Sequence, residues 1–577
     1  MTRNVEAAAR KRELGKFAAA WLLLVAPWFA YPLVWLKVFR AHVPYWDEAV
    51  MFGPPAMALI AAAVLLACGP SGIRRACGRS KSNFALVIAA AALWIISLVR
   101  SLMGGELPDP GEWSVFLLPL AGMALSREIL RILPLYGTAL LAVLIFFTCR
   151  FTYFTGLPGN WNWNLSLLAA LLPAPFLFFR RVSSRRIWFV LLLPLAAAAA
   201  FSWFHPELAP RGTIVGAVFA SVVIWLSFKS SCRQRSMLLF LSGGAGAVVF
   251  FTVWFGPADS AVRSSRVWLW RGSAELAVSH SAVGVGMAGF ERRINPHLPK
   301  DYYFSDFAVE KHPHPHNEFL ALWCGYGVVG AVFLVLLCLG SVQGFRVGSA
   351  VRIWAFWMFL LLLVHGQFDV LLDTPIAGTP FWCLGGVLTG VPVRGGKFRP
   401  ILGACGLLAA LLWAGMSFHA GILARDSRFD SLAGDRFSAR DKLERSLAIF
   451  PTPRTRYRAG MVEFFDFKDP DGAVRHLSKL YPGYVHSNGF LARAYAVRGD
   501  VKAALEHFER ETRYYPMSAL NAFWELEVMK LCNVSEAELS LRRARLNYLL
   551  KIRGLSMERI GELIGNPALD DAPLKNP

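Results

Sequence analysis

The residues with the clearest capacity for chemistry form the tetrapeptide His314-Pro315-His316-Asn317. It closes the polar segment 256–317 and runs directly into the apolar stretch 319–339. Titratable side chains at the edge of a membrane helix lie where polar chemistry can meet a lipid-borne substrate. Histidine and proline are also common in interfacial loops, so the tetrapeptide alone is weak evidence for catalysis. The rest of the sequence strengthens it.

Composition places the chain among polytopic membrane proteins. Hydrophobic residues make up 55% of its 577 residues, charged residues 17%, and the mean hydropathy is +0.43. We therefore expect an all-α fold with about 12–14 membrane spans. The apolar stretches lie near 17–36, 54–69, 84–99, 113–125, 132–149, 164–179, 187–203, 213–228, 237–255, 318–340, 353–371, 376–391 and 400–418.

The loops between these stretches predict an orientation. Basic residues precede the first span and recur in every second loop, at 74–81, 127–131, 180–186, 229–235, 346–352 and 394–399. The alternate loops are poorer in cations or carry acidic residues such as Glu106, Asp109 and Glu112. The positive-inside rule then places the N-terminus in the cytoplasm and, with an odd number of spans, the C-terminal region outside. The net charge of +21 follows from these turns, so we expect no nucleic-acid partner.

Cysteine usage argues against a disulfide framework or a structural metal. Most of the nine cysteines lie in or beside apolar stretches, and only Cys532 falls in the long soluble tail. No Cys-x-x-Cys or His/Cys metal-binding spacing is present. We therefore expect no structural zinc site.

Two polar segments interrupt the membrane pattern. The first, 256–317, lies between two spans on the outer side and has the length of a functional loop. The second begins near 420. We expect a membrane domain at 1–419, with loop 256–317 carrying its site, and a soluble helical domain at 420–577.

The tail resembles paired helices that repeat, with Pro451, Pro482 and Pro516 closing successive units. The best unit is 485–516. The positions at which a tetratricopeptide repeat places packing residues hold Leu491, Ala492, Tyr495, Ala504, Phe508 and Pro516, and Ala473 and Leu477 mark a degenerate earlier unit. A generic helical hairpin is the simpler interpretation. Either form suits binding or docking.

Several other residues could contribute chemistry or only anchor the chain. Arg211-Gly212 begins the span at 213–228, where arginine commonly anchors a helix at the interface. Arg266 stands in Arg266-Val-Trp-Leu-Trp270, followed by Arg271, a pattern that also suits an interfacial amphipathic helix. Gly284-Val285-Gly286 is a weak dinucleotide signal without a surrounding strand–helix unit. Asp369 and Asp373 are either ordinary loop acids or partners for the arginines.

The spacing of these motifs resembles a known family. The outer loop reads Arg266-x-x-x-Trp270, Gly284-x-Gly286 with Phe290, and His314-x-His316-Asn317-x-x-Leu320, followed by Gly327 and Gly330. This order is similar to that of the O-antigen ligase and polymerase superfamily. The stretch Gly159-Asn160-x-Asn162 and the pair Arg211-Gly212 resemble its earlier motifs, although Pro210 stands where that family usually has serine. The resemblance covers roughly 150–390, and a periplasmic repeat-bearing tail is similar to that of protein-glycosylating ligases.

The resemblance implies glycan transfer at the outer face of a bacterial inner membrane, with the C-terminal domain in the periplasm. The donor would be a glycan on undecaprenyl diphosphate, and the acceptor a hydroxyl of lipid A core or of a protein. The resemblance also implies that the reaction needs no metal and no cofactor. Guanidinium groups suit a diphosphate leaving group, so we expect Arg211 and Arg266 to act there, with Arg271 as a weaker third. His316 would take the proton of the acceptor hydroxyl or bind phosphate as a cation. His314, Asn317 and Trp270 would assist substrate binding.

Two other functions remain open from the sequence. A polymerase that joins repeat units on the same carrier would use nearly the same residues. A transporter is the alternative from another class, but His365 is the main ionisable residue within the apolar stretches, and it lies near an end. The soluble tail favours a ligase over a polymerase and a protein acceptor over a lipid.

Overall fold

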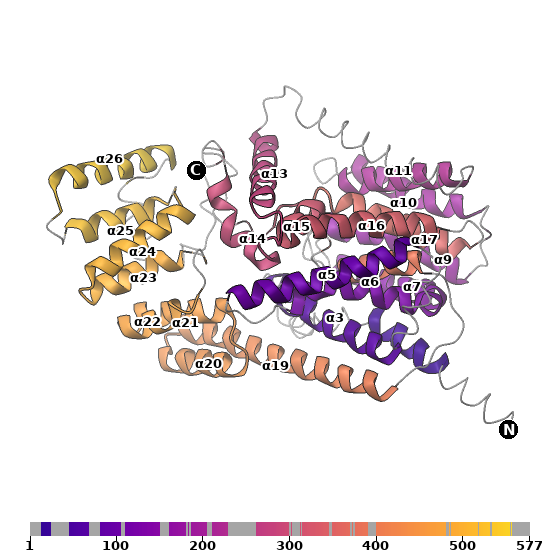
Figure 1. The fold of residues 1–577 in the computed structure, drawn as a ribbon, viewed down its shortest axis with the longest axis horizontal. Helices are drawn as coiled ribbons and strands as arrows, with labels where there is room; N and C mark the ends of the chain where they lie inside the picture. The colour runs from indigo at the N-terminus through magenta and orange to yellow at the C-terminus, as the bar shows by residue number, and fades with distance from the viewer. Residues whose placement is uncertain are drawn as a thin grey trace. The chain divides into compact units, whose positions relative to one another are not determined.

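The computed structural model describes residues 13–24, 46–68, 81–104, 110–150, 161–179, 183, 186–204, 211–228, 261–298, 302, 312, 314–345, 349–369, 372, 375–390, 400–480, 484, 486–516, 518–530, 534–553 and 556. Of these, 86% are helical and none lies in a strand. The expected all-α class is therefore confirmed for this part of the chain (Figure 1).

The chain divides into two compact units. The first comprises 1–256, 280–287 and 316–415, and the second 257–279, 288–315 and 416–577. The outer loop thus contributes to both units. Helix α19, Pro400–Leu432, begins in the first unit and continues into the second, so the expected domain boundary at 419 falls inside a helix.

Helices of the first unit follow the apolar stretches. They are α3 (Trp46–Cys68), α5 (Lys81–Gly104), η1 (Pro110–Trp113), α6 (Ser114–Ala124), α7 (Ser126–Arg150), α8 (Trp161–Leu171), α9 (Ala174–Phe179), α10 (Ile187–Phe204), α11 (Arg211–Phe228), α15 (Glu318–Tyr326), α16 (Val328–Gly344), α17 (Ala350–His365) and α18 (Pro375–Thr389). Residues 13–24 are also helical. Helix α17 lies at the centre, since 352–362 are all buried, and it packs against α11 and α18.

Some predicted stretches break into two helices or end early. The stretch 318–340 forms α15 and α16, which meet at Gly327 in a left-handed conformation with φ 66°. The stretch 164–179 forms α8 and α9, and 353–371 ends its helix at His365. The stretch 237–255 lies outside the described residues.

Two helices of the described chain combine the length and the apolar composition that a membrane crossing requires. They cover Asn83–Arg100 and Ser126–Phe146. Shorter apolar helices cover Met57–Cys68, Ser114–Ala124, Asn164–Phe179, Gly212–Phe228, Val328–Gly344 and Ala350–His365.

The second unit holds the loop helices and the tail. Its helices are α13 (Ala261–Ser279), α14 (Met287–Arg293, with Met287 in the first unit), η3 (Asn295–His297), α20 (Arg436–Ile449), α21 (Pro453–Phe465), α22 (Pro470–Leu477), α23 (Ser487–Val497), α24 (Val501–Tyr514), α25 (Ala519–Lys530) and α26 (Glu536–Arg553). From α20 to α26 each helix packs against the next in chain order (Figure 1).

Local sequence explains where these tail helices begin. Asp435, Thr452, Asp469 and Asp500 each cap a helix by accepting a hydrogen bond from the backbone N–H three residues later. Of the predicted packing residues of the unit 485–516, which holds the helix pair α23–α24, four are buried and two are half-buried. Leu491, Ala492, Ala504 and Phe508 are buried, whereas Tyr495 and Pro516 are half-buried. The tetratricopeptide-like form of the tail stays a prediction.

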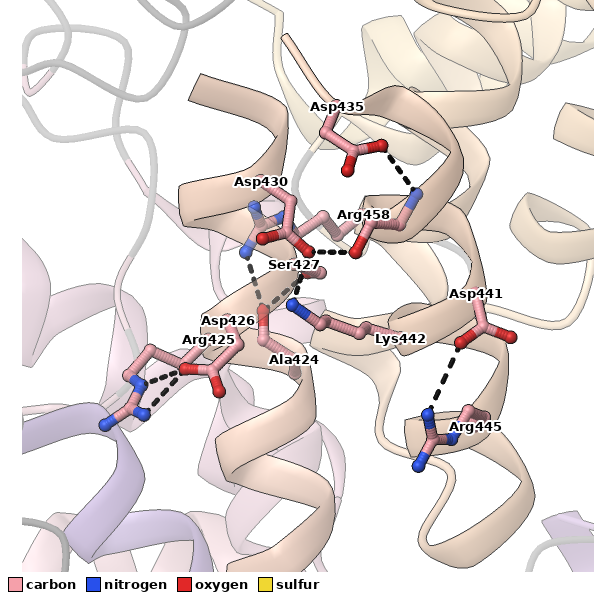
Figure 2. Close-up of polar contacts among 11 residues, drawn as sticks. Ala424, Arg425, Asp426, Ser427, Asp430, Asp435, Asp441, Lys442, Arg445 and Arg458 are labelled. Atoms are coloured by element: carbon pink, nitrogen blue, oxygen red, sulfur yellow. Dashed lines mark hydrogen bonds and ion pairs between the residues drawn. The ribbon is translucent and has the colours of Figure 1, made fainter. Parts of the chain in front are cut away.

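The end of α19 is held by side chains of α20 and α21 (Figure 2). Arg458 donates from Nη1 to the carbonyl oxygen of Ala424 at 3.0 Å. Lys442 Nζ lies 2.5 Å from Asp430 Oδ2. Burial, with neighbouring arginines, lowers the pKa of Arg458 to about 10. It stays charged at neutral pH, and this charge-assisted bond ties α21 to α19.

Candidate functional site

The histidine motif forms the N-terminus of α15. Asn317 is its N-cap, since its side-chain oxygen accepts a hydrogen bond from Leu320 N at 2.9 Å. The same side chain donates from Nδ2 to Gln367 O at 3.0 Å, and Glu318 N donates to Gly366 O at 2.8 Å. These bonds fix the turn after α17 against the start of α15. The turn continues to Asp369.

This arrangement pairs His316 with Asp369. His316 Nδ1 lies 3.3 Å from Asp369 Oδ1. The Asp369 side chain is only 10% exposed, whereas that of His316 is 30% exposed. A carboxylate beside Nδ1 favours the tautomer with its proton there, which puts the lone pair on Nε2, where a general base needs it. From the sequence, Asp369 is either an ordinary loop acid or a partner for an arginine. In the structure its carboxylate pairs with His316.

The backbone of His316 is in the left-handed region, with φ 53°. This conformation costs about 1–2 kcal/mol in a residue with a side chain. Strain of this kind persists only where the surrounding structure over-determines it, and it clusters at functional sites. The capped helix and the bound turn 366–369 supply that constraint here.

A buried polar cluster lies at the C-terminal end of α17, just before the turn that carries Asp369. His365 Nδ1 is 2.7 Å from Ser166 Oγ, which is 2.5 Å from Thr213 Oγ1, and all three residues are buried. These bonds join α8, α11 and α17. Asp369 N donates to His365 O at 3.2 Å, so the cluster adjoins the turn that carries Asp369.

The expected Arg211-Gly212 pair stands at this cluster. Arg211 begins α11, and a Cβ placed on Gly212 would lie 3.0 Å from His365 Nδ1. The absence of a side chain at Gly212 therefore lets the start of α11 approach His365. The first unit thus brings the backbone at Arg211 to the C-terminal end of α17, which is followed by the turn with Asp369. The position of the guanidinium group lies outside the described part of the structure.

The other end of α15 is locked to the Gly284–Gly286 loop. Val285 N and Gly286 N donate to Cys324 O and Gly325 O at 2.7 and 2.9 Å. Gly284 and Gly286 have φ of 67° and 84°. The glycines thus serve a close backbone contact, and this explains the motif without a dinucleotide.

A partly buried ion pair also holds this end of α15. Arg100 pairs with Glu112 and donates to Gly325 O at 2.7 Å. Glu112 Oε1 accepts from Met287 N at 2.9 Å, and Tyr326 Oη donates to Glu112 O at 2.6 Å. In the sequence, Glu112 stands out only as an outer-loop acid and Arg100 does not stand out at all, since nothing in their spacing marks a pair.

The remaining candidates belong to the second unit. Trp270 on α13 is buried and donates from Nε1 to Pro315 O at 2.9 Å. Arg266 lies one turn earlier and is half-buried, and Arg271 is exposed. Phe290 and His314 are buried. Helix α13 is therefore bound to the segment that leads into His316.

The structure brings together only part of the expected site. In the first unit it joins His316, Asn317 and the turn at Asp369, with the start of α11 at the same end of α17. In the second it joins Trp270 to the residue that precedes His316. The convergence of Arg266 and Arg211 on His316 stays a prediction. Gly159, Asn160 and Asp373 lie outside the described residues.

Comparisons with models of protein families, with curated proteins and with solved structures found no match to this chain.

Proposed function

We propose that this protein is a membrane glycosyltransferase that moves a glycan from undecaprenyl diphosphate to an acceptor hydroxyl. The observation that carries the proposal is the His316–Asp369 pair at the N-terminus of α15. A partly exposed imidazole with a buried carboxylate behind it suits general-base chemistry. The spacing of Arg266, Trp270 and the His314–Asn317 motif, which resembles the O-antigen ligase superfamily, supplies the substrate class.

The proposed step is a substitution at the anomeric carbon. The acceptor hydroxyl transfers its proton to His316 Nε2 as its oxygen bonds to the anomeric carbon. The bond from that carbon to the diphosphate oxygen breaks, and undecaprenyl diphosphate leaves with the electron pair. Arg211 and Arg266 neutralise the charge that grows on the diphosphate through bidentate hydrogen bonds. In this proposal, protein side chains supply both the general base and the groups that neutralise the diphosphate.

The proposed setting is a bacterial inner membrane. We propose about 12–14 spans for the first unit, of which two long apolar helices and several shorter ones are candidates. The tail would lie in the periplasm as a tetratricopeptide-like domain. The burial of Ala492, Ala504 and Phe508 between α23 and α24 supports that form.

The proposed acceptor is a protein hydroxyl, with lipid A core as the other candidate. Stacked helix pairs offer a surface for a second macromolecule, which a ligase needs in addition to its lipid-linked donor.

Deletion of the gene and analysis of the surface glycans tests this function. We expect glycosylated proteins to lose their glycan stain while the lipid-linked glycan accumulates at normal length. Loss of the long lipopolysaccharide bands instead would assign the acceptor to lipid A core. Unchanged glycoproteins, lipopolysaccharide and carrier-linked glycan together would contradict glycan transfer by this protein.

A further inference from the structure

Three side chains with metal-binding atoms converge in the tail, in a place that the transfer chemistry does not use. Glu444 lies on α20, Glu463 on α21 and His476 on α22. One ligand atom from each lies within 4.8 Å of the other two. Three successive helices therefore bring two carboxylates and an imidazole to one point.

Two of these side chains are almost fully buried. The side chains of Glu463 and His476 are 2% and 6% exposed. Glu463 Oε1 accepts from Arg440 Nε at 2.7 Å, but Oε2 is buried with no hydrogen-bond partner among the described residues. A buried carboxylate oxygen without a partner is costly, because it has lost water and gained nothing in exchange.

The imidazole faces the same point with poor hydrogen-bond geometry. His476 Nε2 lies 3.0 Å from Glu444 Oε1, yet among the described residues the nitrogen has no hydrogen bond of acceptable angle. Protonation of His476 would improve its attraction to Glu444. It would leave Glu463 Oε2 as it is, so a proton accounts for only part of the cluster.

We propose that Glu444, Glu463 and His476 bind a divalent transition-metal ion, with Zn²⁺ as the best match. Zinc accepts imidazole nitrogen and carboxylate oxygen at about 2.0–2.2 Å. In a tetrahedral site, those bond lengths separate the ligand atoms by roughly 3.4 Å. The Glu444 side chain is 49% exposed, so it can move inward to close the remaining gap. Imidazole makes Mg²⁺ and Ca²⁺ poor occupants, since both prefer ligands that are all oxygen.

Arg440 would support such an ion by fixing the orientation of one of its ligands, Glu463. Its bond to Glu463 Oε1 would hold the carboxylate in one orientation. The bound ion would tie α20, α21 and α22 together and stabilise the first helices of the tail. The sequence lacks the short cysteine and histidine spacings of a structural zinc site and therefore predicted none, whereas the ligands proposed here are spread over three helices.

Zinc binding to the full-length protein tests the proposal. The protein is purified in detergent under reducing conditions, its affinity tag is removed, and it is stripped with a chelator. Zn²⁺ affinity is then measured by competition with a chromogenic chelator. Glu444→Gln and His476→Gln are compared with Glu509→Gln, which removes an exposed carboxylate elsewhere in the tail. We expect one tight site per chain, weakened at least about tenfold in the first two variants and unchanged in the third.

Thermal unfolding provides the second measurement. Zn²⁺ should raise the unfolding temperature of the parent protein and of Glu509→Gln, but not that of Glu444→Gln. Glu444 is half-exposed, so its variant should fold even if His476→Gln does not. Absence of tight Zn²⁺ binding, equal affinity in all variants, or displacement of Zn²⁺ by equimolar Ca²⁺ would overturn the proposal.

Discussion

His316 and Asp369 differ in exposure, and this difference assigns each its proposed role. The more exposed imidazole can meet a substrate, whereas the buried carboxylate can only hold the imidazole. Asp369 is thus a positioning residue in the proposed reaction. It favours one tautomer of His316 and stabilises the imidazolium that forms when the acceptor proton arrives.

Asp369→Asn tests this role. The amide retains the shape but lacks the negative charge, so we expect kcat for glycan transfer to fall at least about tenfold, towards the roughly 10²–10⁴-fold that general acid–base catalysis contributes. The KM for the lipid-linked donor should change little, because Asp369 is not proposed to contact it. Single-substrate titrations of the purified variant separate the two constants. A raised KM with an unchanged kcat would show that Asp369 acts in binding instead.

In the tail, His507 makes stability depend on pH. Burial, with Arg510 nearby, lowers the pKa of His507, while its Nδ1 lies 3.0 Å from Asn488 Oδ1. The folded state therefore favours the neutral ring. Its contribution to stability is complete above the ordinary histidine pKa of about 6.5 and is lost as the pH falls below it.

We expect the unfolding temperature of the tail to fall between pH 7.5 and pH 5.5, and to fall less in His507→Gln. Thermal scans at both pH values, with the full-length protein in detergent, measure this difference. Equal losses in the parent protein and the variant would show that His507 does not contribute.

Among the elements, the two ends of α15 have different roles. Its N-terminus carries the His316–Asp369 pair, and its C-terminus is fixed by the Gly284–Gly286 loop and by the Arg100–Glu112 pair. We infer that the loop and the ion pair hold α15 in place, so the glycines of the motif support the site from a distance.

Gly284→Ala should destabilise the protein by at least about 2 kcal/mol. A left-handed backbone costs about 1–2 kcal/mol in alanine, and overpacking adds about 1–3 kcal/mol. The new Cβ would lie 2.5 Å from the backbone of Gly325. Gly415→Ala is the matched control, because that helical glycine has no heavy atom within 4 Å of a Cβ. It should be neutral or slightly stabilising. Equal unfolding temperatures for the two variants would contradict the role of Gly284.

The sequence predicted the positions of many elements but few of the contacts between them. Apolar runs located the helices because burial of apolar surface drives their packing. The break at Gly327 was not predicted, since it depends on a left-handed residue that periodicity does not reveal. His316 was found through its titratable side chain and its spacing, whereas Asp369 and His365 acquired partners only through tertiary contacts between distant segments.

At the scale of the whole molecule, the tail distinguishes a ligase from a polymerase. Removing 436–577 keeps α19 intact and deletes α20–α26. In a ligase we expect transfer to the acceptor to fall while the donor accumulates at its normal chain length, because the tail is proposed to recognise the acceptor. Gel analysis of the carrier-linked glycan measures the chain length. Single repeat units on the carrier would favour the polymerase.

The most direct test of the proposed function is a transfer assay with purified protein, a lipid-linked glycan and an acceptor. His316→Ala should abolish transfer without loss of folded protein, since a partly exposed side chain at the start of α15 contributes little to core packing. Arg266→Lys should be severely impaired, because lysine keeps the charge but loses the bidentate geometry. Near-normal transfer by both variants would contradict the account.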